Sequence, residues 1–256
     1  MMGWRCLLVI FTLICSSCFK KSVELSESNP PDHSPFTILL QKHVNEKGMV
    51  NYQAFLKDRK SLSDYLESLT KSAPAKNWTE KEKLAFWINA YNAFTIALIL
   101  EYYPVESIKD IGPKISIPFV NTPWQIDFIE IGSKKYNLDD IEHGIIRKEF
   151  DEPRIHFALV CAAVSCPKLR HEAYEAEKLD MQLQEQALDF LMDASKNNLN
   201  ANPVQVSKIF QWYAADFKSN HASVLDYVNS LLPNPLPTNT KVEYAEYYWD
   251  LNEQKN

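Results

Sequence analysis

The stretch that decides the fold is LAFWINAYNAFTIALIL, which runs from Leu84 to Leu100. Its side chains are apolar almost all round a helical projection, and this pattern predicts a helix that is buried on most sides. Thr79 and Glu82 form a capping-box signature before the stretch, and Pro104 stands after it. We therefore expect one core helix from Thr79 to Tyr103.

Two amide side chains, Asn89 and Asn92, lie inside this apolar helix, one turn apart on neighbouring positions of one face. Buried amides must find hydrogen-bond partners. We treat both as candidate binding residues that could donate to an oxyanion.

Outward from this helix, the pattern predicts helices first and strands mostly in the second half of the chain. The run RIHFALVCAA, Arg154 to Ala163, is almost continuously apolar and rich in strand formers, which predicts a strand buried at the centre of a sheet. The class is therefore α+β, with a mostly helical N-terminal half packed on a central, mainly antiparallel sheet. The other expected helices span 36–44, 53–69, 138–150, 172–192 and 222–232, and the other strands fall within 115–136, 204–206 and 243–250.

The chain begins with MMGWRCLLVIFTLICSSCFKK, in which Arg5 precedes a short apolar run and small residues. This order is typical of a secretory signal, although an uncleaved anchor or a different start site is the alternative. Cys18 follows two serines, so it could become the lipidated first residue of a lipoprotein. We expect a leader over 1–18, a polar tether over 19–35 and a single domain over 36–256. The protein would then be exported, as a periplasmic protein or a membrane-anchored lipoprotein of the cell envelope.

Composition excludes some partners. The formal net charge of −6 offers no basic face for phosphate, so no nucleic-acid partner is expected. A Gly-rich phosphate loop is missing from the sequence, and we expect no cofactor and no metal. Membrane contact is expected only through the leader or its lipid, and the oligomeric state is unknown. Three of the 5 cysteines lie in the leader, which leaves Cys161 and Cys166 as a bridge or a reactive thiol.

Candidate catalytic residues gather between positions 138 and 169. In the helix LDDIEHGIIRKEF, Glu142 falls inside the apolar stripe and His143 at its edge. A carboxylate buried there must be paired or have a raised pKa, and a purely structural Glu–Arg or Glu–His pair explains it equally well. Arg154 is the expected partner of Glu142.

The expected central strand adds His156, which should face away from Cys161 because side chains alternate along a strand. A satisfied core histidine is the competing interpretation of His156. Cys166 stands before Pro167 at a turn, where the N–H groups at a helix start would stabilise a thiolate; a free or bridged structural cysteine is the alternative.

Together these residues match the composition of a Cys-His-Glu hydrolase site. Cys166 would be the nucleophile, His156 or His143 the base and Glu142 the orienting carboxylate. A peptide or small amide would be its substrate. A metal site built from His143, His156, Cys166 and His171 is a weaker alternative, since the spacings match no familiar zinc pattern.

Four blocks of the sequence resemble the domain-of-unknown-function 547 family, in the order in which that family has them. They cover roughly 83–217 and read LAFWINAYNAF, DDIEHGIIR, PRIHFALVCAAVSCPKL and VSKIFQWYAADF. The resemblance implies a fold similar to papain-like or transglutaminase-like cysteine hydrolases, with Glu142, His143, Arg154, His156 and Cys166 on the matching positions. This chain departs from the family around Cys161, where members often have an Asn before the cysteine and a Gly after it.

Two functions remain open from the sequence. One is an exported thiol hydrolase that acts on a peptide or related amide. The other is a non-catalytic binding or scaffold module tethered to the envelope, in which Glu142, Arg154 and His156 form a buried structural network.

Overall fold

The computed structural model describes residues 28–112 and 122–255 of the chain. The leader, the lipidation candidate Cys18 and most of the predicted tether lie outside the described residues. So does the first part of the strand region predicted over 115–136. The described residues are 48% helical and 8% strand, so helices build the domain and the strands are accessory.

The α-helices of the described residues are α1 (Ser34–His43), α2 (Tyr52–Phe55), α3 (Arg59–Lys71), α4 (Glu80–Tyr102), α5 (Arg147–Glu149), α6 (Leu179–Met192), α7 (Ile209–Trp212), α8 (Ala214–Phe217) and α9 (Val224–Leu231). The 3₁₀ turns are η1 (Leu56–Asp58), η2 (Ile108–Asp110), η3 (Pro123–Gln125) and η5 (Pro153–Phe157). A π-helix, η4, spans Asp140–Ile146 and continues into α5. The helix predicted over 138–150 is thus present, with π geometry over much of its length.

Two small sheets accompany these helices. β1 (Ile129–Ile131) pairs antiparallel with β2 (Lys134–Tyr136), and the turn between them contains Gly132 with a φ of 63°. β3 (Val204–Val206) pairs parallel with β4 (Val242–Tyr244). The strand predicted over 204–206 is confirmed, whereas the described residues hold these two pairs in place of a central, mainly antiparallel sheet.

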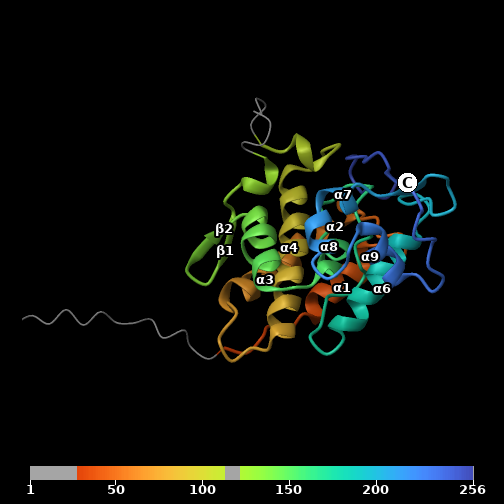
Figure 1. Cartoon of the computed structure of the whole chain (residues 1–256). Coiled ribbons are helices and arrows are strands. Elements are labelled where there is room, and N and C mark those ends of the chain that lie inside the picture. The colour runs from red at the N-terminus through yellow and green to blue at the C-terminus, as the bar shows by residue number, and fades with distance from the viewer. Residues whose placement is uncertain (1–27, 113–121, 256) are drawn as a thin grey trace, which may run out of the picture.

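α4 is the core helix that the sequence predicts. Thr79 caps it through the expected box with Glu82, and the helix ends at Tyr102 before Pro104. In Figure 1 it runs through the middle of the molecule, between the β1–β2 hairpin and the side that holds α6 and α9. Within the described residues it is also the one helix long and apolar enough to cross a membrane by length and composition, but 89% of that apolar window is buried in the domain. Burial of this kind is what a core helix shows.

The predicted central strand over 154–163 is wrong. Its first part is the 3₁₀ turn η5, which starts because Pro153 occupies the first turn and the Glu152 carboxylate accepts from the Arg154 N–H. The segment is apolar because α4 and α6 cover it, and side-chain amides take the place of neighbouring strands. Asn92 of α4 bonds the Ala158 carbonyl (2.9 Å) and the Val160 N–H (2.9 Å). Gln186 of α6 bonds the carbonyls of Phe157 and Lys168.

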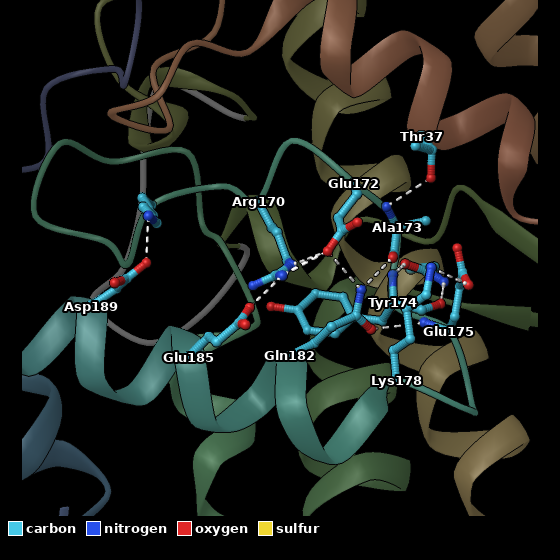
Figure 2. A network of polar contacts seen from close by, with 12 residues as sticks. Thr37, Arg170, Glu172, Ala173, Tyr174, Glu175, Lys178, Gln182, Glu185 and Asp189 are labelled. Atoms are coloured by element: carbon cyan, nitrogen blue, oxygen red, sulfur yellow. Dashed lines mark hydrogen bonds and ion pairs between the residues drawn. The ribbon is translucent and has the colours of Figure 1, made fainter.

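The segment before α6 is held by a polar network instead of extending that helix back to residue 172, as the sequence predicts (Figure 2). Arg170 pairs with Glu172 and with Glu185 of α6. Gln182, also on α6, bonds the Ala173 carbonyl and the Glu175 N–H. These bonds use backbone groups that a longer helix would have to pair internally.

The C-terminal segment, residues 247–254, returns across the domain. Its backbone bonds the loop that follows η5, through Val164 N–H to Asp250 O (2.8 Å) and Asn252 N–H to Ala162 O (2.9 Å). Asn252 also accepts a hydrogen bond from the hydroxyl of Tyr52, a residue near the start of the domain in the sequence. These contacts place the aromatic residues of the C-terminal segment beside η4 and α7.

Candidate functional site

A cavity of about 250 Å³ lies where η4, η5, α7 and the C-terminal segment meet, with further lining residues from α4 and η3. Six aromatic residues line it, namely Tyr91, Trp124, Trp212, Tyr213, Tyr247 and Trp249. The other lining residues include Asp139, Glu142, His143, His156, Cys161 and Cys166. The structure therefore brings the four predicted catalytic residues, Cys166, His156, His143 and Glu142, to one cavity.

Cys166 is bonded to Cys161 in a disulfide, and its residue is 3% exposed. The Cys161 N–H donates to the Cys166 sulfur (3.1 Å), and the Tyr247 hydroxyl lies 3.2 Å from that sulfur and 3.3 Å from the Cys161 sulfur. A bonded sulfur is not a thiolate, so the described state has no thiol nucleophile. Of the two alternatives that the sequence leaves open for this pair, the structure has the bridge.

Cys161 shares the cavity with His156, against the expectation that the two face opposite sides. The expectation assumed a strand, and the chain at this place is a 3₁₀ turn followed by a loop. Ala162 has a φ of 60°, in the left-handed region that alanine seldom occupies, and it turns the chain between the two cysteines. Backbone strain of this kind is often found at functional sites.

Glu142 is 6% exposed, which agrees with its predicted place inside the apolar stripe. Its carboxylate accepts a hydrogen bond from the Tyr213 hydroxyl of the α7–α8 junction (2.6 Å). His143 lies beside it, with Nδ1 3.8 Å from Glu142 Oε1, and its side chain is 43% exposed. Burial and the Glu142 carboxylate together raise the pKa of Tyr213 well above its ordinary value.

His156 takes its carboxylate partner from α8, not from η4. Its Nε2 lies 2.8 Å from Asp216 Oδ2, and its ring stacks on Tyr213 at 3.8 Å between centroids. Burial lowers the pKa of His156. For His156 the predicted third member is thus wrong, because Asp216 and not Glu142 orients this imidazole. For His143, the other candidate base, the carboxylate beside the ring is Glu142, as predicted.

Arg147 completes the polar network around Asp216. Its Nε and Nη2 form a two-pronged pair with the carboxylate at 2.6 and 2.8 Å. Hydrogen bonds from His156, and then from Arg147, hold the pKa of Asp216 well below its ordinary range. Because Arg147 also contacts His143 Nδ1 (3.1 Å), one connected network joins η4, η5 and α8.

The three predicted binding residues do not line the cavity. Asn89 exchanges two hydrogen bonds with the Tyr174 backbone, and Asn92 exchanges two with the 158–160 segment, so neither amide is free for an oxyanion. Arg154 pairs with Glu152 and Asp180 on the surface and is not the partner of Glu142.

A metal centre is not assembled from the suggested residues. His156 is held by Asp216, Cys166 is bonded to Cys161, and His171 is not among the residues that line the cavity. In the part of the chain that the structure describes, His, Cys, Asp and Glu side chains form no group of three that could hold an ion.

Several residues of the cavity are not singled out by the sequence. Tyr213 lies in the fourth block, as does Asp216, which pairs with the lining residue His156. Tyr247 and Trp249 lie in the aromatic segment 243–250, so the sequence already shows these residues. What the sequence does not show is that these segments meet residues 140–160 in space.

The fold and this site define a mostly helical domain with a small cavity that is aromatic and acidic and stands beside a closed disulfide. Residues 75–191 of the chain match the family described as "Protein of unknown function, DUF547". This match confirms the resemblance that the first three sequence blocks indicate, and it ends before the fourth block. No curated protein and no solved structure shows significant similarity to the chain. The implied likeness to cysteine-proteinase folds has no support from these comparisons.

Proposed function

We propose that the cavity beside the Cys161–Cys166 disulfide binds a small ligand and that the domain acts as a binding module. The observation that carries this proposal is the closed disulfide at the one position where the predicted hydrolase needs a thiolate. A concave site rich in aromatic rings, with a few placed polar groups, remains, and such sites are the usual form of small-ligand pockets.

The polar groups around the cavity favour a preformed site. Glu142, His156 and Asp216 each have a partner that fixes their orientation, through Tyr213 and Arg147. A site whose side chains are already held in place loses less conformational entropy when a ligand binds.

We further propose that the protein is exported and that Cys18 carries a lipid. The signal-like leader and the serines before Cys18 support this, and so does the bridged cysteine pair, because disulfides persist mainly in oxidising compartments. Globomycin treatment of expressing cells tests the lipid. We expect the unprocessed precursor to accumulate in treated cells. Lipidation at Cys18 would be contradicted if the electrophoretic mobility stayed unchanged on treatment and the Cys18→Ala variant migrated like wild type.

Ligand binding can be tested by titrating the ¹⁵N-labelled protein with a panel of small cationic, anionic and neutral compounds. We expect at least one class to shift the indole N–H signals of Trp124, Trp212 and Trp249 saturably. Trp78 serves as an internal control, because it is buried elsewhere and its indole N–H donates to the Ser28 carbonyl. The proposal would be contradicted if none of the compounds caused saturable shifts, or if the Trp78 signal shifted as much as the other three.

A second candidate function, the thiol hydrolase, is favoured by one observation: Cys166 and His156 line the same cavity, and His156 is paired with Asp216. After reduction, the Cys161 N–H and the Tyr247 hydroxyl could stabilise a thiolate at Cys166. The thiolate would attack an ester carbonyl and expel the alkoxide or phenolate.

This candidate predicts stoichiometric p-nitrophenol release from p-nitrophenyl acetate by the protein reduced with a phosphine. Cys166→Ala should remove the burst, whereas Cys161→Ala should retain it. Equal release by wild type and Cys166→Ala would exclude the hydrolase.

A further inference from the structure

We propose that the ligand of this cavity is a small organic cation, whose ammonium group lies against the aromatic wall and faces the carboxylate of Glu142. This inference rests on the proposed binding function and names its ligand class. Three features of the cavity lead to it: the arrangement of its rings, its charge and its size.

The rings form a continuous wall. Trp212 and Tyr247 lie 4.8 Å apart between centroids, Tyr247 and Trp249 4.7 Å, and Trp124 and Trp249 5.7 Å. The faces of tryptophan and tyrosine attract cations through their quadrupole, and groups of such rings are used to recognise alkylammonium ions. Trp249 already has such a contact, because the Lys109 ammonium lies 4.9 Å from its ring centroid.

The charge of the lining is negative. Asp139 and Glu142 both line the cavity, whereas the described lining residues include no lysine or arginine. Among the described residues, the one basic group within ion-pair distance of Glu142 is the half-exposed imidazole of His143, at 3.8 Å. The positive charge of Arg147 is engaged by the two-pronged pair with Asp216.

The field of Glu142 reaches the ring wall. After burial itself, the Glu142 carboxylate is the next cause that raises the pKa values of Tyr91, Tyr213 and Tyr247. Burial also raises the pKa of Asp139. A buried carboxylate without a strong cation beside it is costly, and a bound cation would offset that cost.

The size of the cavity limits the ligand. About 250 Å³ is below the roughly 300 Å³ at which pockets for drug-sized ligands begin. A compact head group such as trimethylammonium or a short alkylamine is therefore expected, and a large aromatic cation is not.

The test compares choline with its neutral isostere, 3,3-dimethyl-1-butanol, which has nearly the same shape and no charge. Calorimetry and the indole N–H signals would give the dissociation constants for wild type and for Glu142→Gln. Glu130→Gln, an exposed carboxylate on β1, is the matched control. We expect choline to bind wild type and Glu130→Gln roughly 5- to 30-fold more tightly than the isostere, since a cation–π contact contributes roughly 1–2 kcal/mol and 1.4 kcal/mol is tenfold. In Glu142→Gln that preference should be clearly smaller, with only the part that the rings contribute remaining, while the isostere binds as before.

Trp212→Leu provides a second variant should Glu142→Gln fail to fold, because Trp212 is 47% exposed and its replacement leaves the core intact. It should weaken choline at least about fivefold. Equal affinity for choline and the isostere would overturn the cation inference and leave the binding function standing. If neither choline nor the isostere binds but another compound of the panel does, the cation inference is rejected and the proposed binding function is kept. If nothing binds, the proposed function falls with it.

Discussion

Asp216 connects the polar network behind His156, which lines the cavity. Its carboxylate contacts both Arg147 and His156, and these contacts keep its pKa well below the ordinary range. The sequence pattern favours Glu142 for the orienting role, because Glu142 falls inside the apolar stripe of its helix. Asp216 lies 60 residues from His156, and pairing over that distance depends on packing that no local pattern encodes.

Replacing Asp216 with Asn should therefore lower the free energy of unfolding by about 1.5–3 kcal/mol, the range for hydrogen bonds to charged groups. Urea denaturation measures the change. Asp189→Asn is the control, because Asp189 pairs with Lys168 on the surface and its loss should cost less than about 1 kcal/mol. Equal effects of the two variants would contradict the importance assigned to Asp216.

Stability should also fall as the pH is lowered from about 7 toward 4.5. Burial lowers the pKa values of His33, His43 and His156 in the folded protein, that of His33 to about 4, so the unfolded chain binds protons first, below its histidine pKa of about 6.5. Stability is then lost as the pH falls through that window. Below about pH 4 the depressed pKa of Asp216 adds a further loss of the same sign.

Urea midpoints measured across this pH range test how much the histidines with lowered pKa values contribute to the pH dependence of stability. His156→Gln should flatten the dependence between pH 7 and 5, whereas the same substitution at exposed His171 should leave it unchanged. A stability that rises on acidification would mean that the folded protein, and not the unfolded chain, binds protons first.

At the scale of elements, the sequence predicts the helices better than the strands. α4 is found with its capping box and its end before Pro104, and η4 carries Glu142 inside as the helical periodicity requires. The strand prediction for 154–163 is wrong because an apolar segment buried under helices has the same composition as a central strand. Periodicity cannot distinguish the two, since the deciding bonds come from Asn92 and Gln186 on other helices.

Asn92→Ala should consequently destabilise the domain by roughly 2–4 kcal/mol. It leaves the Ala158 carbonyl and the Val160 N–H without their partner, and each buried group left unpaired costs about 1–3 kcal/mol. The matched control is Asn220→Ala, whose amide makes an exposed contact with Asp151. A loss below about 1 kcal/mol in Asn92→Ala would show that the amide does not hold the segment.

At the scale of the whole molecule, the cavity needs more of the chain than the family match covers. The matched residues, 75–191, supply Glu142, His156 and both cysteines, whereas Tyr213, Tyr247 and Trp249 come from beyond them. The C-terminal segment is tied to the loop after η5 and to Tyr52 near the start of the domain. The sequence shows this segment as aromatic, but its place beside the cavity depends on these long-range contacts.

A chain that ends at residue 245 should therefore lose at least roughly 10 °C in thermal midpoint, since each kcal/mol shifts the midpoint by about 2–4 °C in a domain of this size. The deletion removes two cavity rings and the Asn252 hydrogen bonds. A chain ending at residue 254 is the control and should melt like the full chain. Equal midpoints would mean that the segment is only an accessory.

The most direct test of the binding-module proposal is the oxidation state of the cysteine pair in the native protein. Both cysteines lie in one tryptic peptide, residues 155–168, so mass spectrometry reads the pair apart from the leader cysteines. The native protein treated with iodoacetamide without reductant should give this peptide unalkylated and two hydrogens lighter than the dithiol, and after reduction it should carry two carbamidomethyl groups. Alkylation of Cys166 in the unreduced native protein would contradict the binding module and restore the thiol hydrolase.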